Sequence, residues 1–116
     1  MGTLWIAVVL FLIAAVIGLT VWLKIMGNKP TNKAVALIHG LVAVIGFLMV
    51  LIFTIGATAG APVGALILFA VAALGGLTLF VRDLMKTPGP KWLAVLHPLL
   101  AVVGLLLLLV FILGAK

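Results

Sequence analysis

The sequence contains no cysteine and only one acidic residue, and these absences narrow what the protein can be. Without cysteine, disulfide bonds, iron–sulfur centres and thiolate chemistry are excluded. Charged residues make up only 7% of the 116 positions, whereas hydrophobic residues make up 68%. A soluble domain of this length could not bury so much apolar surface, but a lipid bilayer does not require it to. The composition therefore predicts an integral membrane protein.

Four apolar runs, each about 20 residues long, alternate with short loops, and a helix of that length spans ~30 Å of hydrocarbon. The predicted spans are residues 4–23, 34–55, 63–81 and 92–113. Trp5 and Trp22 lie near the two ends of the first run, which is typical of an aromatic belt at the membrane surfaces. We therefore expect an all-α, up-down bundle of four transmembrane helices.

Six of the seven basic residues lie in two loops, at residues 24–33 and 82–91. These loops share one side of an alternating bundle, and the positive-inside rule makes that side cytoplasmic. We expect both termini to be periplasmic, in the inner membrane of a bacterium. The net charge of +6 is also a reason to consider nucleic-acid binding. Because the cations flank apolar runs, we expect contact with the lipid bilayer and no nucleic-acid partner.

The chain contains an internal duplication within one predicted domain. Residues 1–58 align with residues 59–116 without a gap. The identical pairs include a proline, a lysine and a histidine: Pro30 with Pro88, Lys33 with Lys91, and His39 with His97. Apolar composition alone would not match these three residue types at one offset. Since each half holds two spans, the sequence predicts two parallel helical hairpins related by an axis along the membrane normal.

The only two histidines, His39 and His97, lie inside apolar runs, where an ionisable side chain is rare and usually functional. Helical spacing puts each on a face of small residues. These two faces are Ala36, His39, Ala43, Gly46 and Ala94, His97, Ala101, Gly104. The other span of each half has a face with one phenylalanine: Ala7, Phe11, Ala14, Gly18 and Ala65, Phe69, Ala72, Gly76.

Depth, counted from the basic loops, pairs these faces level by level. His39 and Gly18 both lie about 9 Å into the membrane, and Phe11 and Gly46 share a deeper level. The second half repeats the pattern. We therefore expect an axial slot that is lined by small residues, crossed by imidazoles from diagonal helices, and closed at its deep end by Phe11 and Phe69.

Such a slot suits a flat apolar cofactor with anionic groups at one edge, and haem b is such a cofactor. Its iron takes two axial imidazoles, and its propionates can pair with Lys or Arg. The predicted metal ligands are His39 and His97. The other predicted cofactor-binding residues are Gly18, Gly46, Gly76, Gly104, Ala43, Ala101, Phe11, Phe69, Lys33 and Lys91. We expect one bis-His haem and electron exchange with a partner on the cytoplasmic side, rather than an enzyme.

The pattern His-Gly/Pro-Leu-x-Ala-Val-x-Gly, which occurs at residues 39–46 and 97–104, resembles a family of small four-span bacterial membrane proteins built from a duplicated hairpin. The chain also resembles, more loosely, membrane b-type cytochromes, natural or de novo designed, whose bundles present paired histidines. That resemblance implies axial ligation by His39 and His97. It also implies that four glycines are packing positions: Gly18, Gly46, Gly76 and Gly104. Two-haem cytochromes have more histidines, so the resemblance supports one haem.

Other interpretations stay open. The imidazoles can be structural groups that bond each other or nearby carbonyls, or proton-linked groups, in a non-redox four-span protein for interaction or transport. Small-residue faces are also typical of ordinary helix packing. A zinc or copper site would need three or four ligands, and no acid or cysteine lies in the predicted spans. The absence of acidic residues from the predicted spans and the small size of the chain argue against a transporter, although a homodimer would provide a larger transport path.

Several local features are also predicted. Asn32 or Thr31 can cap the second span. Pro98 removes the backbone bond to the Ala94 carbonyl and is expected to weaken the helix just after His97. Two threonines, Thr20 and Thr78, are expected to bond back to their own helices.

Overall fold

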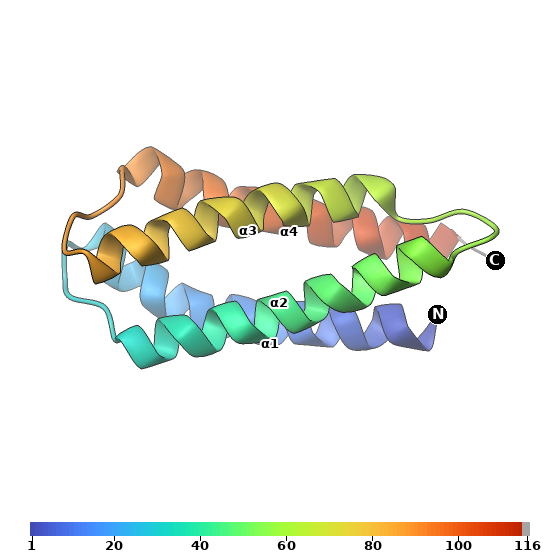
Figure 1. Ribbon diagram of the computed structural model, residues 1–116, viewed down its shortest axis with the longest axis horizontal. Helices are drawn as coiled ribbons and strands as arrows, with labels where there is room; N and C mark the ends of the chain where they lie inside the picture. The colour runs from blue at the N-terminus through green and yellow to red at the C-terminus, as the bar shows by residue number, and fades with distance from the viewer. Residues whose placement is uncertain (115–116) are drawn as a thin grey trace.

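The computed structural model describes residues 1–114 and consists of four helices that run up and down in turn (Figure 1). The helices are α1 (Gly2–Met26), α2 (Lys33–Gly56), α3 (Val63–Leu84) and α4 (Lys91–Gly114). Within the described residues the chain forms no strand, which confirms the predicted all-α bundle. The molecule is 46 Å long, and each helix is long and apolar enough to cross a membrane.

The four helices pair as two hairpins, α1 with α2 and α3 with α4, and pack more closely within each hairpin than between them. Between the hairpins, α2 lies beside α3 and α1 lies beside α4, so α2 and α4 are diagonal. Figure 1 shows the loops after α1 and α3 at one end of the bundle, with the α2–α3 loop at the other. The predicted arrangement of two parallel hairpins is therefore confirmed.

The helices are longer than the apolar runs that predicted them. α1 continues to Met26 and α3 to Leu84, past the last apolar run and into the basic loops. Just after these ends, Asn28 and Lys86 have φ values of 54° and 57°, in the left-handed region. Backbone N–H groups beyond each end bond back to carbonyls of the last turn. The helices thus end where the backbone reverses, and hydropathy misses that point by a few residues.

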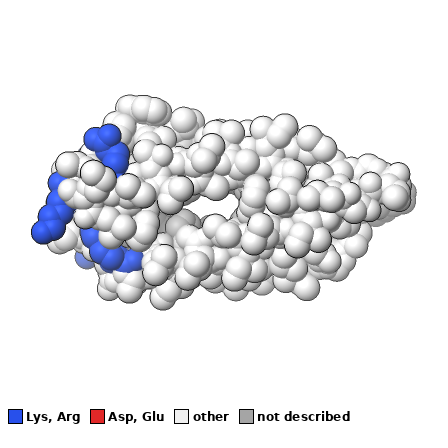
Figure 2. All heavy atoms as spheres, viewed as in Figure 1, with Lys and Arg blue, Asp and Glu red and all other residues white. Residues whose placement is uncertain are grey.

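The buried core lies in the half of the bundle away from the basic loops. Its members come from all four helices: Leu4, Ala7, Val8, Val50, Ala65, Phe69, Leu108 and Ile112. Nearer the basic loops the interior is less filled, because His39, Ala43, His97 and Ala101 are only half-buried. Figure 2 shows an opening between the two hairpins near the middle of the bundle. Apolar packing therefore joins the hairpins in one half and leaves space in the other.

Polar contacts join the hairpins at the basic end. Lys33 Nζ lies 2.9 Å from the Asp83 carboxylate, and the Thr31 hydroxyl donates to the same carboxylate. Lys91 Nζ donates to the Met26 carbonyl at 3.1 Å. Figure 2 shows the visible Lys and Arg side chains gathered at this one end. This separation of cations from the apolar body is the predicted charge pattern.

The local predictions are mostly confirmed. Asn32 caps α2, because its Oδ1 accepts from two backbone N–H groups at 3.0 and 3.2 Å. Thr31 does not cap, because its hydroxyl is bonded to Asp83. The hydroxyls of Thr20 and Thr78 donate to carbonyls of their own helices at 2.6 and 2.8 Å.

Trp22 departs from the predicted aromatic belt. Its indole N–H points to α4 and donates to the Ala94 carbonyl at 3.0 Å. Trp5, in contrast, is 44% exposed, as a belt residue would be. Position in the sequence places both tryptophans near helix ends, but only the packed structure shows that one of them joins two helices.

Helix α4 continues through Pro98 without a break.

Candidate functional site

The two histidine rings lie across the bundle axis, on the diagonal helices α2 and α4. The ring centroids of His39 and His97 are 6.1 Å apart and their planes cross at 86°. In the part of the chain that the structure describes, no hydrogen bond joins the two rings. The two halves of the chain thus bring their single histidines together, as the duplication predicts.

Each imidazole is bonded to the neighbouring helix of its own hairpin. Nδ1 of His39 lies 2.7 Å from the Ala14 carbonyl oxygen, and Nδ1 of His97 lies 2.8 Å from the Ala72 carbonyl oxygen. A carbonyl oxygen can only accept, so each Nδ1 carries the proton. The neutral ring then has its lone pair at Nε2. Such a bond fixes the tautomer and orientation of a ring, as the second partner of a metal-bound histidine does.

Both Nε2 atoms stay available to accept a hydrogen bond or bind a ligand. Among residues 1–114, neither Nε2 has a hydrogen-bond partner, and no unpaired side-chain nitrogen is fully buried. The lone pairs therefore face space that a ligand or a water molecule can reach. The sequence predicts the histidines as site residues but not their partners Ala14 and Ala72, because every residue has a backbone carbonyl and residue type does not show which one accepts.

Gly18 and Gly76 let the imidazoles approach α1 and α3. A Cβ built on Gly18 would lie 2.6 Å from Cε1 and 2.8 Å from Nδ1 of His39. On Gly76 it would lie 2.7 Å from Cε1 of His97. The predicted level match is confirmed, and its physical reason is now specific: these glycines make room for the imidazole rings themselves.

Gly46 and Gly104 play the same part for the phenylalanines. A Cβ on Gly46 would lie 3.2 Å from the Phe11 ring, and one on Gly104 would lie 3.1 Å from the Phe69 ring. Phe11 and Phe69 stack across the axis, with ring centroids 4.0 Å apart and planes 16° from parallel. The pair closes the deep side of the histidine level, as expected, and Phe69 is also part of the buried core.

A layer of alanines separates the histidine pair from the phenylalanine pair. Ala14 and Ala72 are buried, whereas Ala43 and Ala101 are half-buried. One turn deeper, Gly46 of α2 and Gly104 of α4 are buried. About 10 Å of helix length separates the two aromatic levels, and the side chains of this layer are small methyl groups. The opening in Figure 2 lies near the same mid-length of the bundle.

Lys33 and Lys91 lie at the mouth of the site, but both have partners. Lys33 pairs with Asp83, and Lys91 bonds the Met26 carbonyl. An anionic group of a cofactor would have to replace these contacts to reach the ammonium groups. The sequence prediction missed the ion pair, although Asp83 is the only acid in the chain.

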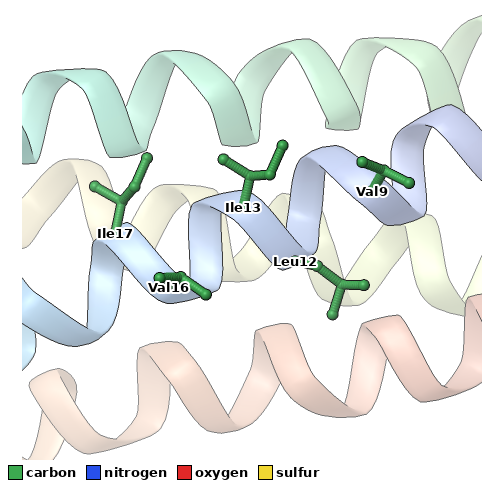
Figure 3. A pocket seen from close by; sticks show the side chains of 5 residues that line it. All are labelled: Val9, Leu12, Ile13, Val16 and Ile17. Atoms are coloured by element: carbon green, nitrogen blue, oxygen red, sulfur yellow. The ribbon is translucent and has the colours of Figure 1, made fainter.

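Two surface hollows lie away from the histidines. Figure 3 shows one on the outer face of α1, lined only by apolar side chains: Val9, Leu12, Ile13, Val16 and Ile17. The other lies at the opposite end from the basic loops, beside Phe53, Phe111 and the α2–α3 loop. Within the described residues, no group of three or more His, Cys, Asp or Glu side chains is placed to hold a metal ion.

No protein-family model, no curated protein and no solved structure matches the chain. The resemblance to duplicated four-span proteins and to b-type cytochromes therefore stays a prediction, and the function rests on the arrangement of the site.

Proposed function

We propose that this protein is a small membrane b-type cytochrome that binds one haem b between His39 and His97. The main support is the paired Nδ1 bonds, which leave an Nε2 lone pair on each of two rings that lie near each other on diagonal helices. A metal–imidazole bond is about 2 Å long, so two rings on one metal have centroids about 6 Å apart. The observed separation of 6.1 Å is close to this value.

The residues around the rings fit a flat apolar group. The methyl groups of Ala43 and Ala101 leave space below the histidines, and the stacked Phe11 and Phe69 rings limit its depth. Seven residues, or about 10 Å of helix, separate the histidine level from the phenylalanine level. The side chains between the two aromatic levels on these faces are apolar.

A bound haem would be held by His39 and His97 and would supply a one-electron centre for electron transfer. In that role the chain fixes both imidazole tautomers through Ala14 and Ala72. Lys33 and Lys91 can bind propionates by exchanging their present contacts. Because the histidines lie about 9 Å from the basic end, electrons would be exchanged with a partner on that side.

We also propose that the basic loops face the cytoplasm and that both termini face the periplasm of a bacterial inner membrane. The support is the gathering of Lys and Arg at one end of the bundle, shown in Figure 2. The same cations can contact anionic lipid headgroups.

Hemin titration of the purified protein, with single-site variants, tests the proposal. We expect saturation at one haem per chain. Because the two rings share one iron, His39→Ala and His97→Ala should each abolish the low-spin spectrum. Gly40→Ala is the matched control, since a Cβ at this neighbour of His39 would meet nothing within 4 Å. A His39→Ala protein that keeps the bis-His spectrum would rule out the shared haem.

One observation favours a second candidate, a non-redox four-span protein for interaction or transport. The Nδ1 bonds join α1 to α2 and α3 to α4, so the imidazoles already stabilise each hairpin without any cofactor. In that case hemin would not bind, and His39→Ala would lower the stability of the cofactor-free protein. The oligomeric state of the chain in detergent would then be measured next, since a homodimer would supply a larger surface.

A further inference from the structure

We propose that Trp22 is a positioning residue for His97, because its indole N–H replaces the backbone donor that Pro98 lacks. In an unbroken helix the N–H at position 98 would donate to the carbonyl of Ala94. Trp22 Nε1 lies 3.0 Å from that carbonyl oxygen. Ala94 is 1% exposed, so bulk water does not reach it, and an unsatisfied carbonyl inside a membrane is costly. The indole thus completes the hydrogen bonding of α4.

The duplication supplies an internal comparison. The positions that correspond to Trp22, Ala94 and Pro98 are Phe80, Ala36 and Gly40. Gly40 keeps its backbone N–H, and Phe80 has no donor to offer. The loss of a donor at position 98 and the gain of a donor at position 22 therefore occur together, and the structure brings these two positions to the same contact between α1 and α4.

The contact acts on the turn that carries His97. Ala94 lies one turn before His97, and Pro98 directly follows His97. The indole bond ties this turn to α1 of the other hairpin, while the Nδ1 bond ties the ring to Ala72 of its own hairpin. Among residues 1–114, His39 has only the bond within its hairpin. Two imidazoles that are equivalent in the repeat are therefore held differently.

A double-mutant cycle tests this relationship with the residues of the other copy. Trp22→Phe should lower the resistance of the cofactor-free protein to denaturation, because the Ala94 carbonyl loses its donor. Pro98→Gly restores a backbone donor, so Trp22→Phe should have a much smaller effect in that background. Pro98→Ala provides a second route to the same donor if glycine at this position prevents folding. Trp92→Phe, at a tryptophan that is 66% exposed, is the control and should behave as wild type.

The positioning role needs a readout at the ring itself. In NMR spectra of the imidazole nitrogens, Trp22→Phe should shift the His97 signals more than the His39 signals, and Pro98→Gly should reverse this shift. Equal losses of stability from Trp22→Phe with proline or glycine at position 98 would overturn the proposal, as would equal shifts at both histidines.

Relevance to ligation rests on the proposed haem site, but the cycle and the NMR measurement do not. In haem-loaded protein, Trp22→Phe should shift the midpoint potential, and Pro98→Gly should restore it. If positions 22 and 98 are coupled but the protein does not take up hemin, only the proposed function is refuted. Haem binding without coupling between positions 22 and 98 would refute the role of Trp22 alone.

Discussion

The ring of His39 lies against the backbone of Gly18, so closely that a Cβ there would be 2.6 Å from Cε1. The second copy repeats the contact between His97 and Gly76. Each hairpin therefore holds its imidazole between a glycine of the facing helix and the alanine carbonyl one turn deeper. This arrangement leaves no room for a side chain at Gly18 or Gly76, and it leads to the first prediction.

Gly76→Ala should destabilise the protein by about 1–3 kcal/mol, the usual cost of overpacking an interior. The added methyl would displace the His97 ring and break its bond to Ala72. Gly75→Ala is the matched control on the same helix, because its Cβ would have ordinary contacts of 3.5 Å and 4.0 Å. It should stay within about 1 kcal/mol of wild type. Unfolding in mixed detergent measures both, and equal effects would contradict the ring–glycine contact.

The stacked pair Phe11–Phe69 should show energetic coupling. Replacing either ring by leucine removes the stack, so the second replacement should cost less than the first. We expect a coupling energy of about 0.5–1.5 kcal/mol from a double-mutant cycle of unfolding free energies. Leu106, which is 56% exposed, supplies a comparison: Phe11→Leu and Leu106→Ala should be additive. Additive effects of the two phenylalanine changes would argue against the stack.

Asp83→Asn should have only a small effect, of about 1 kcal/mol or less, although it breaks the ion pair between the hairpins. The Lys33 and Asp83 side chains are 43% and 27% exposed, so solvent screens their attraction. The loss should shrink further when the salt concentration is raised. A salt-independent loss of several kcal/mol would show that this contact, rather than apolar packing, holds the hairpins together.

Membrane orientation can be measured with single cysteines, because the chain has none of its own. Thr58→Cys, in the α2–α3 loop, should react with an impermeant maleimide in intact cells. Lys29→Cys, in the first basic loop, should react only after the cells are lysed. The cysteine-free parent controls for background labelling, and the reverse pattern would overturn the proposed orientation.

Hydropathy and the duplication predicted most of the architecture from sequence. The four spans, the hairpin pairing and the meeting of His39 with His97 follow from apolar run length, charge placement and the repeat. Equal depth from the basic loops also predicted which glycine faces which ring, because helical rise is constant. These features depend on residue type and spacing, which the sequence contains.

Contacts made through the backbone could not be predicted in the same way. The Ala14 and Ala72 carbonyls that bond the histidines differ in no visible way from other carbonyls. The position of Trp22 near a helix end is typical of an aromatic belt and predicts a place at the membrane surface. Its bond to Ala94 depends on how α1 packs against α4, which only the structure defines. A proline in the facing helix was the one available signal.

An ultraviolet–visible spectrum of the detergent-purified protein, first oxidised and then reduced with dithionite, tests the proposed bis-His haem most directly. Hemin should be added if the preparation contains none. We predict a sharp Soret band and well-resolved α and β bands in the reduced protein. A preparation with no Soret band even after hemin is added would contradict the haem site, and would leave His39 and His97 as structural or proton-linked groups.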